Sequence, residues 1–189
     1  SGKEVYPRPV QDKLPLWIAT GGHVESTVKI AQAGLPIVYA IIGGNPPYFK
    51  KLIQAYREIG SEAGHASHEL KVGAHSWGWI AEDGEQAVKD YFHPTKQVVD
   101  AISKDRPHWQ ELRYEQYLEQ VGPNGAMFVG NPDQVAEKLI RMIEDLSLDR
   151  FMLHLSLGSM PHEQVLRAIE LFGTQVAPKV RAYFAMKEA

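Results

Sequence analysis

Short apolar runs alternate with amphipathic stretches along most of this 189-residue chain. Continuous apolar runs at residues 15–20, 36–42, 71–80 and 151–156 are typical of strands buried on both faces of a parallel sheet. Between these runs, apolar residues recur at the three- and four-residue spacing of helices that pack by one face. The alternation therefore predicts an α/β fold with four parallel, buried core strands and helices outside them.

Glycine, proline and asparagine mark the expected ends of the helices. Gly34 stands where a helix C-terminal glycine is expected, and Asn131 with Pro132 forms a good N-cap and first helical residue. A short strand or extended run is expected at 126–130. Pro94 is expected to kink or end the helix before it, because proline lacks the backbone N–H that a helix interior requires.

Residues 95–124 interrupt the alternation, because they are longer than an ordinary strand-to-helix connection. Their polar and aromatic pattern predicts a helical insertion in which Trp109 and Tyr117 cover apolar surface. No interdomain linker is evident, so residues 1–189 are expected to form a single domain. Four strand–helix units are too few for a (β/α)₈ barrel, which needs about 200–250 residues. The chain is therefore either a small open sheet or part of a barrel.

Composition excludes several classes of function. The chain has 20 basic and 23 acidic residues and a net charge of −3, which argues against a nucleic-acid partner. No apolar run approaches the roughly 20 residues of a membrane span, so no membrane partner is expected. The absence of cysteine excludes disulfides and thiolate chemistry and fits a cytoplasmic location. His65 and His68 lack a nearby third ligand, so no metal site is expected.

The segment Thr20-Gly21-Gly22, followed by Ser26, is the strongest candidate for ligand binding. Glycines between a strand and a helix let backbone approach a ligand, and the N–H groups of the helix start favour an anion. Ser26 can add a hydroxyl, whereas Glu25 would repel an anion and is expected to point away. The alternative is that the glycines only make a tight turn.

Two histidines are the candidates for acid–base chemistry. His75 shares one strand face with Trp77 and Trp79, and His154 lies on the last strand. Imidazole and indole side chains can line a ligand pocket, and a histidine with a near-neutral pKa can transfer protons. The alternative is a packed core with hydrogen-bonded histidines. The sequence assigns no definite catalytic residue.

Several segments together carry a family pattern. They are Tyr6–Gln11 leading into Leu14–Gly22, then Glu25-Ser26, Ala33–Pro36, Val129–Ala136, Pro161–Leu166, Ile169–Phe172 and Val176–Arg181. In this order and spacing the chain, from about Tyr6 to Arg181, resembles the C-terminal half of bacterial-luciferase-like flavin-dependent oxidoreductases. The first half of the family pattern has no counterpart in these residues.

The resemblance implies a TIM-type (β/α)₈ barrel of which this chain holds the last four strand–helix units. It implies FMN, or alternatively a deazaflavin, at the carboxyl ends of the strands. The FMN phosphate would lie at Thr20, Gly21, Gly22 and Ser26. Ala40 and Ile41 would contact the flavin ring, although apolar strand residues are more simply explained as core.

The implied activity is a monooxygenase that uses reduced FMN and oxygen on a small organic substrate, with a flavin reductase as a partner. A deazaflavin-dependent reductase is the related alternative. A third interpretation is a non-catalytic half-barrel. A half-barrel exposes two strand edges and an apolar inner face, so it is expected to form homo-oligomers.

Overall fold

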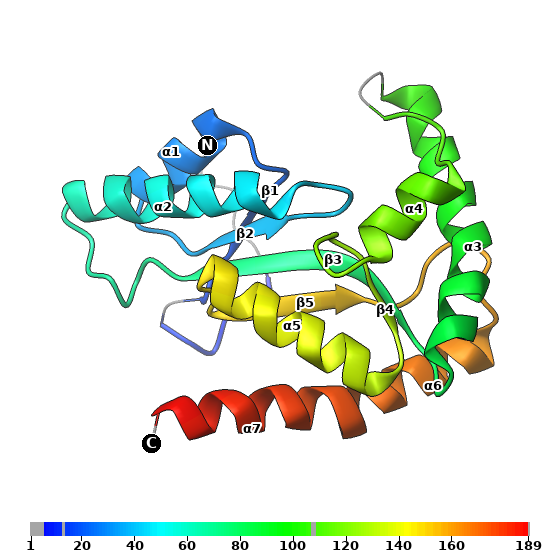
Figure 1. Cartoon of the computed structure of the whole chain (residues 1–189). Coiled ribbons are helices and arrows are strands. Elements are labelled where there is room, and N and C mark those ends of the chain that lie inside the picture. The colour runs from blue at the N-terminus through cyan, green and yellow to red at the C-terminus, as the bar shows by residue number, and fades with distance from the viewer. Residues whose placement is uncertain (1–5, 13, 107–108, 189) are drawn as a thin grey trace.

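The computed structural model describes residues 6–12, 14–106 and 109–188. Four strands form a parallel sheet in the order β1 (Ile18–Thr20), β2 (Ile37–Ala40), β3 (Val72–Ile80) and β5 (Arg150–His154). A fifth, β4 (Phe128–Gly130), pairs in parallel with the end of β3 (Figure 1). The predicted α/β fold with four parallel core strands is confirmed, and the run near 126–130 is a short strand.

The long strand β3 is the centre of the sheet. Its first half pairs with β2 on one side, where Val72 is level with Ile37. Residues 73–77 pair with β5 on the other side, and residues 78–80 pair with β4. Within the described chain β1 pairs only with β2, and β5 only with β3, so each presents one unpaired edge.

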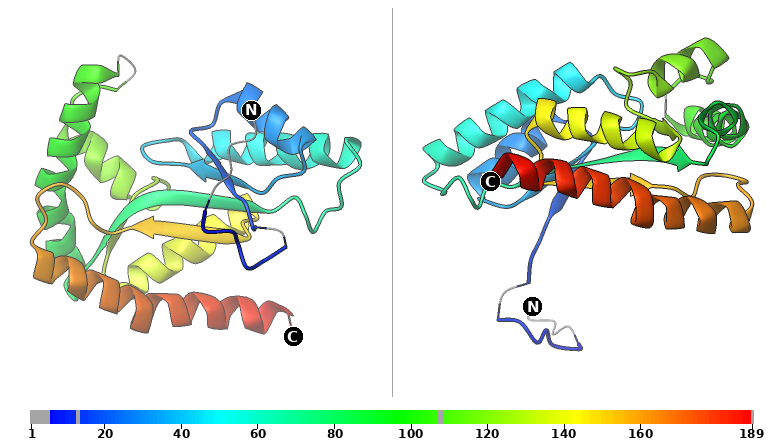
Figure 2. Two further views of the ribbon diagram at one scale, coloured as in Figure 1. Left: turned by 180° about the vertical axis from the view of Figure 1, so that it is seen from behind. Right: turned by 60° about the horizontal axis from the view of Figure 1, so that its bottom comes forward.

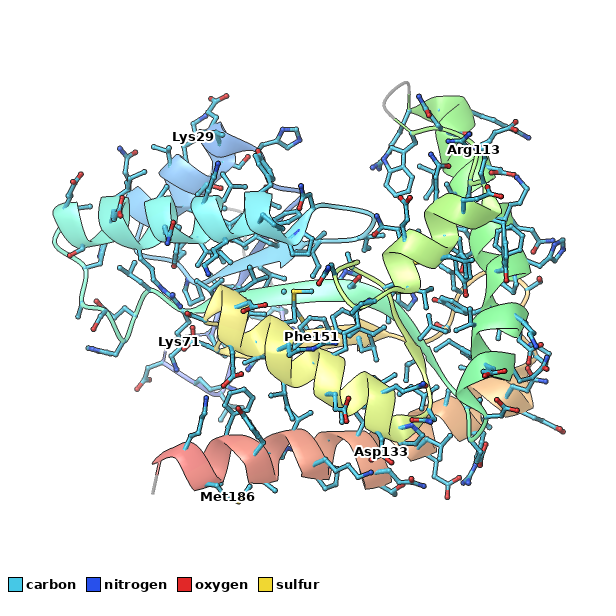
Figure 3. The ribbon with its side chains drawn as sticks, in the orientation of Figure 1. Lys29, Lys71, Arg113, Asp133, Phe151 and Met186 are labelled. Atoms are coloured by element: carbon cyan, nitrogen blue, oxygen red, sulfur yellow. The ribbon has the colours of Figure 1, made fainter. Side chains whose placement is uncertain are left out.

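The helices lie on one face of the sheet and beyond the carboxyl end of β3 (Figure 1). They are α1 (Val24–Gln32), α2 (Pro46–Glu62), α3 (Gly84–Asp105), α4 (Tyr114–Val121), α5 (Pro132–Leu146), α6 (His162–Leu171) and α7 (Ala177–Glu188), with a π-helical turn at Phe172–Val176 before α7. In Figure 3, Phe151 of β5 lies behind α5, and α7 runs beside α5, to which Lys179 ties it by an ion pair with Asp133. No helix among the described residues is both long enough and apolar enough to span a bilayer.

The two faces of the sheet differ in burial. Ile37 and Tyr39 of β2 and Val72 and Ala74 of β3 are completely buried on the helical side. Alternate residues point to the opposite face, which carries no helix when the molecule is seen from behind (Figure 2). We call this the inner face. It is formed by Val38, Ala40, Gly73, His75, Trp77, Met152 and His154.

The prediction that every core strand is buried is wrong for β1. Ile18, level with Ile37 on the helical side, is 37% exposed because β1 is an edge strand with a neighbour on one side only. Ala19, level with Val38 on the inner face, is exposed because no helix covers that face. The strand β5 is half-buried for the same reason. Strands β2 and β3, which are paired on both sides, and β4, which packs against α3 and α5, have the burial that their apolar sequence predicts.

Pro94 neither ends nor interrupts α3, which continues to Asp105. The expectation that the helix ends there is wrong because packing holds the helix together on both sides of the proline. Tyr91 and Val99 are buried on either side of it, and the Thr95 hydroxyl donates a 2.6 Å hydrogen bond to the Tyr91 carbonyl. These contacts offset the backbone bond that proline cannot make.

The described part of 95–124 is largely helical, as predicted, and contains no strand, although residues 109–113 and 122–124 are outside any helix. It comprises the second half of α3 and the whole of α4. Tyr117 is completely buried and donates a 2.7 Å hydrogen bond to the Val88 carbonyl. Trp109 packs against Trp77 with ring centroids 6.4 Å apart, so both predicted aromatic residues cover apolar surface.

Candidate functional site

The turn between β1 and α1 is built around Gly22. Its φ of +96° is a conformation that side chains with a Cβ rarely adopt, and an added Cβ would lie 3.0 Å from the Phe49 ring. The Gly22 N–H donates to the Thr20 hydroxyl at 3.3 Å, and the Tyr48 hydroxyl donates to the Gly22 carbonyl at 2.9 Å. These contacts fix the direction in which the chain enters α1.

The start of α1 offers uncapped backbone donors. Its N-cap, His23, makes no side-chain capping bond, and the first intrahelical bond is from the Thr27 N–H to the His23 carbonyl. The N–H groups of residues 24–26 therefore remain available for an anion. Glu25 forms a 2.7 Å ion pair with Lys29 one turn further on, so its carboxylate is partly neutralised and turned along the helix, as expected.

The four residues predicted to hold a phosphate have different roles. Thr20 is only 9% exposed and its hydroxyl accepts the Gly22 N–H, so it shapes the turn. Gly21 is exposed and Ser26 is half-buried in the first turn of α1. The turn therefore leaves the backbone of Gly21 and the side chain of Ser26 accessible to a ligand, whereas Gly22 is buried and both its N–H and its carbonyl are already bonded. The sequence analysis did not identify Tyr48, whose contact comes from 26 positions further along the chain.

The inner face brings Ala40, His75 and His154 together beside this turn. Ala40 is level with His75 on the neighbouring strand and is half-buried. Gly21 follows Thr20, the register partner of Tyr39, and so reaches the level of Ala40. Ile41, in contrast to expectation, has no exposed surface, so its side chain cannot contact a ring. It belongs to the core because successive strand residues point to opposite faces.

His75 and His154 form a pair on the inner face. Their ring centroids are 5.9 Å apart with a 33° angle between the ring planes. Burial, and to a smaller extent the charge of His154, lower the pKa of His75 from its ordinary value of 6.5. His75 is therefore neutral at pH 7 and can donate one hydrogen bond and accept another. His154 is exposed.

A cleft of about 430 Å³ lies at the carboxyl ends of β2 and β3. We call it the indole cleft, because Trp77 and Trp109 line it together with Ile42, Gly43, Val99, Gln110, Leu112, Gln116, Glu119, Gln120 and Met127. Residues at the ends of β2 and β3 and residues of the insertion line it together. Trp77 was predicted as a pocket or core residue, and it is both, since it is 6% exposed and borders the cleft.

Lys138 supports the wall of this cleft from behind. Its ammonium lies within 3.3 Å of the carbonyls of Gln120, Val121, Gly122 and Met127, and the residue is 6% exposed. Burial, with the nearby charge of Arg141, lowers the pKa of Lys138 to about 7. The sequence analysis missed this residue. Its position on the buried stripe of α5, three residues after Val135 and four before Met142, was the available signal.

A family model described as luciferase-like monooxygenase matches residues 2–163. The chain belongs to the luciferase-like monooxygenase family. Its resemblance to flavin-dependent oxidoreductases of this type, and the α/β fold implied by that resemblance, are thereby confirmed. A search of curated proteins found no match.

Solved structures of this fold extend the comparison. Monooxygenase RslO1 from Streptomyces bottropensis is 21% identical, with a TM-score of 0.70 over 92% of this chain and 50% of its own. The oxygenating constituent of 3,6-diketocamphane monooxygenase from Pseudomonas putida, solved with FMN, is 17% identical, with a TM-score of 0.59 over 87% and 48%. The F420-dependent tetrahydromethanopterin reductase from Methanopyrus kandleri is 17% identical, with a TM-score of 0.58 over 87% of this chain and 52% of its own. The chain spans about half the length of these structures.

The described residues of this luciferase-like chain fit a flavin. A phosphate needs donors without a facing carboxylate, and the start of α1, which the Gly21-Gly22 turn positions, supplies uncapped N–H groups while Glu25 is engaged by Lys29. A flavin ring needs an open, mainly apolar surface with a few hydrogen-bonding groups. Ala40, Met152 and the two histidines of the inner face provide such a surface. In the described part of the chain, no group of three His, Asp or Glu side chains is placed to bind a metal ion.

Proposed function

We propose that this chain forms the flavin-binding half of a luciferase-like monooxygenase that uses reduced FMN and oxygen to oxygenate a small organic substrate. Family membership supports the reaction class. The observation that carries the proposal is the position of the Gly21-Gly22 turn at the end of β1, level with Ala40 and His75 on the inner face. Hydrogen-bond donors for a phosphate and a surface large enough for a flavin ring thus lie next to each other within one chain.

The phosphate is held by the backbone N–H groups at the start of α1 and by the Ser26 hydroxyl. These are charge-assisted hydrogen bonds to the ligand, and the dipole of α1 adds to them. Thr20 and Tyr48 act indirectly, because each bonds to Gly22 and fixes the turn. The bound flavin supplies the redox chemistry of the reaction.

On the inner face, Ala40 leaves room for the ring, and His75 offers a neutral imidazole to a ring carbonyl or to the substrate. His154, 5.9 Å away and exposed, is the group that takes up or releases a proton at the face of the site. The helices behind the sheet keep water from its other face, where Ile41 and Tyr39 are fully buried.

A deazaflavin-dependent reductase is the related candidate, favoured by the likeness of fold to the F420-dependent reductase. Both versions need electrons from elsewhere: a flavin reductase for FMN, and reduced F420 for the deazaflavin enzyme. A cytoplasmic location fits the supply of either and the absence of cysteine in the chain.

A non-catalytic role is favoured by a separate observation, the open inner face and the unpaired edges of β1 and β5. Exposed parallel edges of this kind pair readily with another strand. On this account the chain forms homo-oligomers that cover the inner face of each copy.

A mass measurement in solution, combined with the visible spectrum after incubation with FMN and removal of free flavin, separates these functions. A protein that retains a flavin spectrum supports the oxidoreductase. A colourless oligomer supports the non-catalytic half-barrel and contradicts flavin binding by this chain. The same incubation with F420 distinguishes the deazaflavin version.

A further inference from the structure

The indole cleft has one aromatic, apolar wall. Trp77 and Trp109 meet at a 50° angle with ring centroids 6.4 Å apart, and the buried side chains of Leu112 and Met127 continue the wall. Tilted indoles in contact present flat, electron-rich faces that favour aromatic ligands over aliphatic ones of equal size. A volume of about 430 Å³ lies at the lower end of the range for small-molecule sites.

The opposite wall, from α4, contains the side-chain amides of Gln116 and Gln120. The Gln116 side-chain oxygen accepts the Arg113 N–H at 3.2 Å, and the Gln120 side-chain oxygen accepts the Ala126 N–H at 3.3 Å. Both amides are thereby fixed in direction, and their Nε2 groups have no partner among the described residues. Because each Nε2 is only a donor, this wall suits a ligand that carries acceptor oxygens.

The charge of the cleft excludes one class of ligand. Glu119 is the charged side chain among its lining residues, and no Lys, Arg or His of the described chain lines it. A carboxylate or phosphate ligand would lie beside this carboxylate without a cation among the lining residues, since the buried Lys138 ammonium behind the wall is already bonded to four carbonyls, and this is unfavourable. A neutral ligand escapes that repulsion, and its hydroxyl group can donate to Glu119.

We infer that the indole cleft binds a flat, uncharged aromatic compound bearing hydroxyl or carbonyl oxygens. Calling this compound the substrate rests on the proposed function, but the binding itself does not. Trp109 is then a specificity-determining residue, because it belongs to the insertion and supplies half of the indole surface. The cleft lies beside the inner face, since Trp77 belongs to both.

Calorimetric titration of the flavin-free protein at pH 7 tests this inference with three probes that share one skeleton. These are 2-naphthol (neutral and aromatic), 2-naphthoate (anionic and aromatic) and decahydro-2-naphthol (neutral and saturated). We expect 2-naphthol to bind at least fivefold more tightly than either of the other two. Equal affinity for 2-naphthol and 2-naphthoate, or no binding of 2-naphthol, would overturn the inference.

Variants assign the binding to the cleft. Trp109→Ala should weaken the binding of 2-naphthol at least fivefold. Trp109→Phe keeps an aromatic ring, so its affinity for 2-naphthol should stay within about threefold of the parent's. Glu119→Gln should strengthen the binding of 2-naphthoate by about two- to fivefold, as expected for removing one exposed charge. Glu115→Gln is the matched control, because Glu115 is exposed on the same helix and does not line the cleft.

The outcomes separate this inference from the proposed function. Unchanged 2-naphthol affinity in Trp109→Ala, or an equal response of Glu115→Gln and Glu119→Gln, places the probe elsewhere and overturns the inference. Neither result bears on FMN, which is absent from these titrations. Conversely, loss of FMN binding alone would contradict the proposed function and leave the ligand class of the cleft intact.

Discussion

His75 on β3 and His154 on β5 face each other across neighbouring strands, with ring centroids 5.9 Å apart. Protonation of one ring disfavours protonation of the other, because two like charges at this separation repel. The two residues are 79 positions apart in the chain, and parallel pairing of β3 with β5 alone brings them together.

This pair has a defined pH dependence. His75 should titrate below 6.5, because burial and the charge of His154 lower its pKa. A group whose pKa is lower in the folded state than in the unfolded state contributes stability above the unfolded pKa and loses it as the pH falls through the folded pKa. We therefore expect the free energy of unfolding to fall as the pH is lowered from 7 to 5.

NMR titration of the histidine ring protons provides the measurement. In His154→Ala the pKa of His75 should rise towards 6.5, since one of its two causes is removed while burial remains. A pKa of His75 that is unchanged in this variant would show that the two rings do not interact.

Lys138 should be important for stability. Lys138→Met should lower the free energy of unfolding by about 2–4 kcal/mol, because the carbonyls of Gln120, Val121, Gly122 and Met127 lose their shared donor. Lys89→Met, the same change at an exposed position of α3, should stay within about 0.5 kcal/mol of the parent. Urea unfolding measures both. Equal effects would contradict a supporting role for Lys138.

Ala40 and Ile41 are neighbours that point to opposite faces, so their substitutions should act on different properties. Ile41→Ala should lower the free energy of unfolding by about 2–5 kcal/mol, because Ile41 is fully buried. Ala40→Leu should leave the free energy of unfolding nearly unchanged. It should weaken the binding of FMN more than that of inorganic phosphate, since the added side chain occupies the inner face. Equal weakening of both ligands by Ala40→Leu would show that no ring lies there.

The sequence predicted features that depend on local residues. The alternation of apolar runs and amphipathic stretches predicted the four parallel core strands. Asn131 is the N-cap of α5 as expected, accepting the Gln134 N–H at 3.0 Å, because such a cap is defined within one turn. The glycine turn at the end of β1 was recognisable for the same reason.

Features made by distant partners were not predictable. Pro94 was expected to kink or end a helix, but α3 does not end there, because Tyr91, Thr95 and Val99 hold it together by contacts that a local rule does not include. The exposure of Ile18 depends on how many neighbours β1 has. The partners of Lys138 lie 11 to 18 residues earlier, and no periodicity marks them.

The central claim, that the turn at Gly21 and Gly22 holds a flavin phosphate, is tested most directly by titrating FMN and inorganic phosphate against Gly22→Asp and the parent. Gly64→Asp is the control: Gly64 also has a positive φ, of +91°, and lies at the far end of α2 with no atom near its Cβ position. Circular dichroism verifies that each variant is folded, and Ser26→Ala, a milder change, should weaken FMN a few-fold. We predict weak binding to the parent, on the order of millimolar, that persists in Gly64→Asp and is lost in Gly22→Asp. Equal binding to the parent and to a folded Gly22→Asp variant, or no binding to the parent, would contradict the claim.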